Sequence, residues 1–150
     1  MYEWLLYVHI LAAVIWVGGA VFVQVLAVRV TRSGQPEELP VFARHVEALG
    51  NWLFMPAAVL LLISGAAMTY QVWNFGQGWI VAAIGLWVLS AVIGAIYLAP
   101  RAKRAAKLFE SEGPTSPEAV RLVGRMFLVS RLELLSFAIA IGLMVFKPRL

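Results

Sequence analysis

Long apolar stretches alternate with short polar connections along this chain. Four stretches are almost free of charge, at residues 4–28, 52–72, 79–98 and 126–146. Each is close to the roughly 20 residues that an α-helix needs to cross the hydrocarbon core of a bilayer. The pattern predicts four membrane-crossing helices, joined by connections short enough to make neighbouring helices antiparallel.

Polar residues at the ends of these stretches predict that the helices extend beyond the membrane. Residues 101–112 are rich in good helix formers, and Gly113 and Pro114 then end the helix. Ser116 followed by Pro117 is typical of a helix start. We therefore expect an all-α, integral membrane four-helix antiparallel bundle, in a single transmembrane domain over 1–150. The expected helices are at about 4–30, 40–72, 79–112 and 117–146.

The composition agrees with a membrane protein and excludes several kinds of chemistry. Hydrophobic residues make up 62% of the chain and charged residues only 13%, with a mean hydropathy of +0.85. Soluble domains carry about 25% charged residues, so lipid must cover much of this surface. The chain contains no cysteine, which excludes disulfides, thiolate metal sites and cysteine nucleophiles.

The basic residues predict the orientation in the membrane. Lys147 and Arg149 lie at the end of the bundle that carries the termini, while ten basic residues lie at the opposite end: Arg29, Arg32, Arg44, Arg101, Lys103, Arg104, Lys107, Arg121, Arg125 and Arg131. Lys and Arg accumulate on the cytoplasmic side of membrane proteins, so both termini are expected outside the cytoplasm. The net charge of +4 is then explained by topology and anionic lipid, with no nucleic acid partner.

His9 is the strongest candidate for chemistry, because ionisable residues inside membrane helices are usually functional. Helical spacing places Ala13, Trp16 and Gln24 on the same stripe of the first helix. A histidine, small residues and an aromatic wall together suit the edge of a haem, so His9 is a candidate metal ligand. The alternative is a histidine that only hydrogen-bonds to a neighbouring helix.

Two methionines could supply a second axial ligand at the depth of His9. Met68 in the second helix and Met144 in the fourth are expected at about that level. Methionine is also a common gap-filler in helix packing. His45 belongs to the cytoplasmic end, too far from His9 to share a metal within one chain.

Arg131 and Glu133 lie within the first third of the fourth stretch. They are two positions apart and therefore do not face each other on a helix. One interpretation is a charge network that closes the cytoplasmic end of the bundle with Arg44, Glu47 or Arg101. The other is a substrate or haem-propionate site, with Arg131 as a cofactor-binding residue.

The first helix reads HILAAVIWVGG at residues 9–19. This segment resembles the opening helix of small bacterial membrane proteins that include the HemJ-type protoporphyrinogen oxidases and the CopD-like copper-resistance domains. Weaker similarities are Pro56 with the later Ser64–Gly65 pair, Trp79 and Arg101. The resemblance implies a haem-b-associated four-helix bundle in the bacterial cytoplasmic membrane, in which the histidine at His9 is an axial ligand.

Two departures argue against protoporphyrinogen oxidase activity. HemJ-type enzymes carry a lysine shortly after the tryptophan that opens the third helix, whereas residues 79–84 read WIVAAI. Their fourth helix carries an acidic residue closely followed by proline, whereas residues 131–135 read RLELL. The hypothesis that remains is haem b bound through His9, in electron transfer or haem handling, in a homo-oligomer or a larger membrane complex. The alternatives are a cofactor-free accessory subunit and a copper-transport-like protein.

Overall fold

The computed structural model describes residues 1–148, and Arg149 lies outside the described residues. Four helices are long and apolar enough to cross a membrane: Tyr2–Arg32, Glu38–Val72, Gly78–Glu112 and Pro117–Phe146. The part of the chain described here contains no strand. The prediction of an all-α four-helix membrane bundle is confirmed, and the helix ends differ from the expected ones by at most two residues.

Three of the four helices are interrupted by a π-helical segment, so each is labelled in three parts. The first helix consists of α1 (Tyr2–Ala13), η1 (Val14–Gly18) and α2 (Gly19–Arg32). The second helix consists of α3 (Glu38–Leu49), η2 (Gly50–Phe54) and α4 (Met55–Val72). The third helix consists of α5 (Gly78–Val92), η3 (Ile93–Leu98) and α6 (Ala99–Glu112). The fourth is the single helix α7 (Pro117–Phe146).

Prolines account for two of these interruptions. Pro56 follows η2 and Pro100 follows η3, each within the first two positions of the α-helix that comes next. A proline has no N–H to donate, and its ring clashes with the carbonyl four residues earlier. The preceding turn widens into a π-helical segment, as is common next to such defects.

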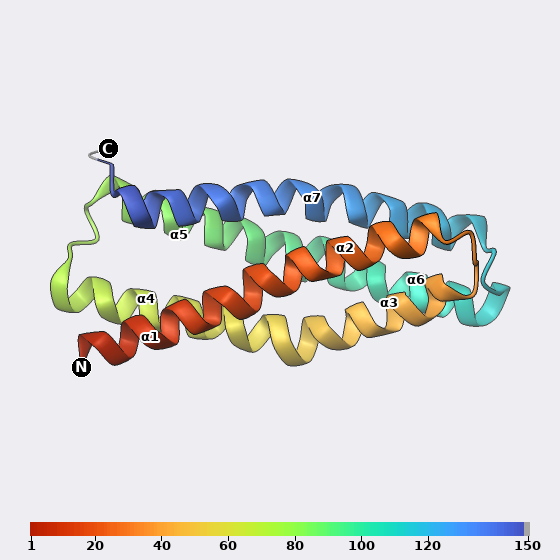
Figure 1. The fold of residues 1–150 in the computed structure, drawn as a ribbon, viewed down its shortest axis with the longest axis horizontal. Helices are drawn as coiled ribbons and strands as arrows, with labels where there is room; N and C mark the ends of the chain where they lie inside the picture. Colours follow the sequence, from red (N-terminus) through yellow and green to blue (C-terminus); the bar gives the residue numbers. More distant parts are fainter. Residues whose placement is uncertain (149–150) are drawn as a thin grey trace.

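The helices run antiparallel, with both described ends of the chain at the same end of the bundle (Figure 1). The connection between α4 and α5 lies at that end, and the other two connections lie at the opposite end. Helices of 30 to 35 residues are about 45–52 Å long at 1.5 Å per residue. The hydrocarbon core is about 30 Å thick, so the bundle projects well beyond it at the basic end.

That projecting end holds the packed core of the protein. Ala43 of α3, Ala105 and Phe109 of α6, and Ala119 and Val123 of α7 form one buried cluster. The turn from α6 to α7 is defined by local signals seen in the sequence. Gly113 takes a positive φ of 88°, and the Ser116 hydroxyl accepts a hydrogen bond from the Ala119 N–H as the N-cap of α7.

At the other end the bundle separates into two helix pairs. There α1 packs closely along α4, and α5 packs along α7, whereas α1 has few close contacts with α7 and α4 has few with α5. Figure 1 shows the two pairs diverging toward the termini. The small buried residues Ala12 and Ala57 let α1 and α4 approach closely, as is usual for helix pairs in lipid.

Candidate functional site

A cleft of about 240 Å³ lies between the two helix pairs. One wall belongs to α1 and α4 and includes His9, Leu61 and Gly65, and the other belongs to α5 and α7 and includes Ala83 and Met144. The lining is almost entirely aliphatic and aromatic. Pockets of this character, with a few polar groups in an apolar wall, are typical of binding sites for small molecules.

Aromatic side chains join the two pairs at the inner end of the cleft. The ring centroids of Trp16 in η1 and Phe137 in α7 are 5.0 Å apart. The Trp87 Nε1–H of α5 donates a hydrogen bond of 3.1 Å to the Ala58 carbonyl of α4. Both tryptophans line the cleft, and these two contacts set its depth.

A second aromatic group lies at the opposite end of the cleft, near the chain termini. The rings of Trp73 and Trp79 meet edge to face with centroids 5.5 Å apart. The Lys147 ammonium lies 4.5 Å from the centre of the Trp73 ring, within cation–π range. All three residues line the cleft, so a single positive charge lies at its mouth.

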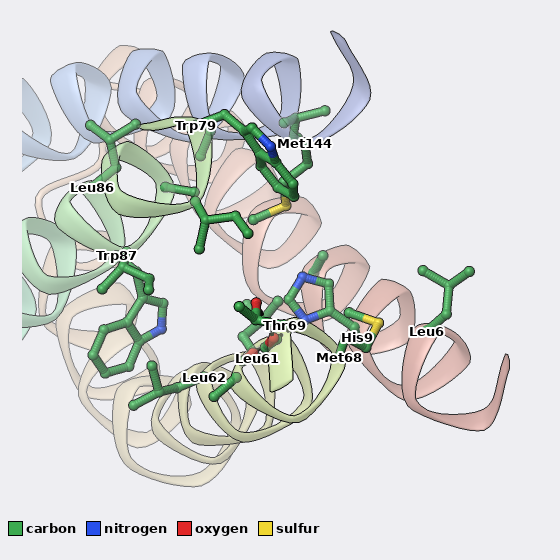
Figure 2. Close-up of a pocket in the computed structure, with 18 of the residues that line it drawn as sticks. Leu6, His9, Leu61, Leu62, Met68, Thr69, Trp79, Leu86, Trp87 and Met144 are labelled. Atoms are coloured by element: carbon green, nitrogen blue, oxygen red, sulfur yellow. Dashed lines mark hydrogen bonds between the residues drawn. The ribbon is translucent and has the colours of Figure 1, made fainter. Parts of the chain in front are cut away.

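His9 projects from α1 into the space between the two walls (Figure 2). Its Nδ1 lies 3.1 Å from the carbonyl oxygen of Leu61 and 3.0 Å from the Ser64 hydroxyl oxygen, both on α4. A carbonyl can only accept, so Nδ1 carries the proton and donates. In the neutral imidazole this leaves Nε2 with its lone pair free, and Nε2 has no protein partner among the described residues.

Ser64 and Gly65 adapt α4 to this histidine. The Ser64 hydroxyl donates to the Leu60 carbonyl and therefore presents a lone pair to His9. A Cβ atom at Gly65 would lie 3.1 Å from His9 Cε1, tighter than most such contacts. Glycine at this position makes room for the imidazole ring against the helix backbone.

Both methionines predicted near His9 line the cleft. In Figure 2 the Met144 side chain extends from α7 on the wall opposite His9. Met68 lies on the same helix pair as His9, on the Leu6 side of the imidazole in this view. Of the two thioethers, Met144 is the one that faces His9 across the open space.

Almost all of the described chain corresponds to one family of membrane proteins. A family model described as "Predicted integral membrane protein (DUF2269)" matches residues 3–148. The chain belongs to this DUF2269 family. No curated protein and no solved structure matches the chain. The comparisons and the fold together establish a multi-pass integral membrane protein, and they give no support to the resemblance with HemJ-type or CopD-like proteins.

The structure brings four of the five predicted cofactor-binding residues to one cleft and leaves one elsewhere. His9, Trp16, Met68 and Met144 line the cleft. Arg131 does not, because it lies about 20 Å from Met144 along α7 at 1.5 Å per residue, near the middle of that helix. His45 is exposed in α3, in the half of the bundle away from the cleft.

The expected charge network around Arg131 and Glu133 is not formed within residues 1–148. Neither side chain makes an ion pair there, and the ion pair found in this part of the chain joins Arg104 to Glu118. The Arg131 side chain is exposed. The prediction was wrong because the basic end of the bundle is closed by apolar packing of α3, α6 and α7, which needs no charges.

Several cleft residues were not predicted as site residues. Trp73, Trp79 and Gly65 line the cleft, and no motif in the sequence assigns them to a site. They line the cleft because the two helix pairs separate at this end of the bundle. No local sequence pattern predicts how far the pairs separate. A usable signal existed for Gly65, because it lies within one helical turn of Met68, which was expected at the depth of His9.

Proposed function

We propose that this membrane protein binds haem b in the cleft, with His9 Nε2 as an axial ligand, and that it serves electron transfer or haem handling. The observation that carries the proposal is the state of the imidazole. Two acceptors on α4 hold the Nδ1 proton, and the free Nε2 lone pair belongs to a residue that lines an apolar cleft. Histidine ligands of metals typically donate their other N–H to a carbonyl in this way.

The character of the walls supports a flat, apolar ring with an anionic edge. The cleft is lined by four tryptophans, Trp16, Trp73, Trp79 and Trp87. Lys147 is a suitable partner for a propionate at the mouth. Haem iron supplies one-electron chemistry when bound, and the protein tunes it through the axial ligands and the apolar surroundings.

The size of the cleft bears on how a haem is accommodated. Pockets for drug-sized ligands measure about 300–1,000 Å³, so about 240 Å³ encloses only part of a haem. The few contacts between α1 and α7 leave the cleft open to lipid on that side. The rest of the ring would therefore be covered by lipid or by a second copy of the chain.

His9 has a defined task in this proposal. The Leu61 carbonyl and the Ser64 hydroxyl fix its tautomer and ring orientation, and they increase the basicity of Nε2. Met144 offers a thioether of the kind that can complete a His–Met ligand pair. The apolar lining excludes water from both side chains.

Absorption spectroscopy of the purified protein tests the proposal. The protein is prepared in detergent, and spectra are recorded before and after addition of haem for the wild type, His9→Ala and His45→Ala. We expect a Soret band in the wild type and in His45→Ala, and its loss in His9→Ala, because His45 lies outside the cleft. A wild type without a Soret band, or a band that survives unchanged in His9→Ala, would contradict the proposal.

A further inference from the structure

A second groove lies at the basic end of the bundle, remote from the cleft. It measures about 310 Å³ and is lined by Arg104 of α6 and by Glu118, Arg121, Leu122 and Arg125 of α7. Three guanidinium groups from two neighbouring helices therefore surround one space. Nothing in the haem proposal uses these residues.

The groove carries an excess of positive charge. Glu118 forms an ion pair with Arg104 and thus offsets one of the three arginines. The Arg121 Nε–H donates to the Pro117 carbonyl, which leaves its two terminal amino groups free. The Arg125 side chain makes no hydrogen bond among the described residues. Two guanidinium groups are therefore available, and guanidinium binds phosphate through paired, charge-assisted hydrogen bonds.

The height of the groove matches the boundary of the bilayer. Arg125 directly precedes the apolar stretch 126–146, and Arg104 lies six residues after the stretch 79–98, about 9 Å at 1.5 Å per residue. Lipid phosphates lie just outside the hydrocarbon core, and basic pockets between membrane helices at this level are suited to anionic head groups. Leu122 adds an apolar contact on the same side.

We propose that this groove binds the phosphate of an anionic phospholipid at the inner face of the membrane. The Arg121 and Arg125 guanidinium groups hold the phosphate, and Glu118 keeps Arg104 beside it. The lipid then lies across the boundary between α6 and α7, where the third and fourth helices leave the membrane.

Native mass spectrometry of the detergent-solubilised protein tests this proposal. The wild type is titrated with phosphatidylglycerol, phosphatidylcholine or inorganic phosphate, and bound lipid is counted directly. We expect phosphatidylglycerol to bind roughly tenfold better than phosphatidylcholine. Equal binding of the two lipids overturns the proposal, and so does displacement of phosphatidylglycerol by an equimolar amount of inorganic phosphate, which would indicate a soluble ligand.

A pair of double variants separates the groove from general positive charge. Arg121→Gln/Arg125→Gln removes the two free guanidinium groups, and Arg29→Gln/Arg32→Gln removes the same charge from the end of α2. We expect a roughly tenfold loss of phosphatidylglycerol binding only in the first variant. An equal loss in both variants overturns the proposal, and the lipid comparison on the wild type decides the matter if the first variant fails to fold.

Discussion

The His9 Nδ1 atom lies 3.1 Å from the backbone carbonyl oxygen of Leu61, so a hydrogen bond joins the first membrane helix to the second. Because the acceptor is a backbone atom, substitution of Leu61 does not remove it. The turn of α4 that carries Leu61 and Ser64 therefore sets the direction of the imidazole. Variants that alter this turn should report on the proposed ligand role without removing the ligand itself.

Ser64→Ala removes one of the two acceptors of the Nδ1 proton. We expect the haem band to persist, because the Leu61 carbonyl still holds the tautomer, and the free energy of unfolding to fall by about 1 kcal/mol. The matched control is Ser90→Ala, since the buried Ser90 hydroxyl has no hydrogen-bond partner among the described residues. Denaturation in detergent measures both changes, and equal losses in the two variants would contradict the role given to Ser64.

Gly65→Ala places a Cβ atom 3.1 Å from His9 Cε1. The imidazole must move by a few tenths of an ångström, so we expect weaker haem retention with a shifted Soret maximum. Gly85→Ala is the control on α5, because a Cβ there meets no atom within 4 Å. Haem titration of both variants gives the comparison, and unchanged affinity in Gly65→Ala would show that the ring position is unimportant.

Met144→Ala tests the ligand proposed on the opposite wall. With a His–Met ligand pair, removing the thioether should lower the midpoint potential, because a Met ligand raises the potential of haem iron. Met68→Ala should leave both the potential and the spectrum unchanged. Redox titration of the two variants measures the difference between their midpoint potentials. Equal midpoint potentials in Met144→Ala and Met68→Ala would exclude Met144 as a ligand.

The orientation can be tested because the chain has no cysteine of its own. Phe75→Cys places an exposed thiol in the connection between α4 and α5, and Ser111→Cys places one near the end of α6, at the opposite end of the bundle. From the distribution of basic residues, a membrane-impermeant thiol reagent applied to intact cells should label the first variant and not the second. The reverse labelling would place the termini in the cytoplasm.

The sequence predicts the number and lengths of the helices well, because each is defined by strong local signals. Residues 52–72 and 79–98 are long apolar runs, and Ser116 and Gly113 mark a helix start and a helix end. The π-helical segments were not predicted. Pro56 and Pro100 indicate where η2 and η3 occur, but η1 has no proline beside it. It lies next to Gly19, where an added Cβ would come within 2.6 Å of Phe54 Cε1.

The candidate site could be predicted only in part. Helical spacing placed Trp16 beside His9, and comparable depth placed Met68 and Met144 near them, so residues on three of the four helices sufficed to suggest the group. The partners of Nδ1 could not be predicted, since one is a backbone carbonyl and the other, Ser64, also suits helix packing. The separation of the helix pairs results from packing of the whole bundle.

The uneven packing of the bundle has a consequence for its local stability. The cluster around Phe109 and Val123 buries side chains from three helices, whereas the end near the termini is held mainly within two separate pairs. Among the amide hydrogens outside the hydrocarbon core, those of α6 and of the first turns of α7 should exchange slowest with solvent deuterium, because they open only with the whole fold. At the end that bears His9, the pair α1 and α4 can then move relative to the pair α5 and α7. The basic end stays folded during this motion and holds the four helices together.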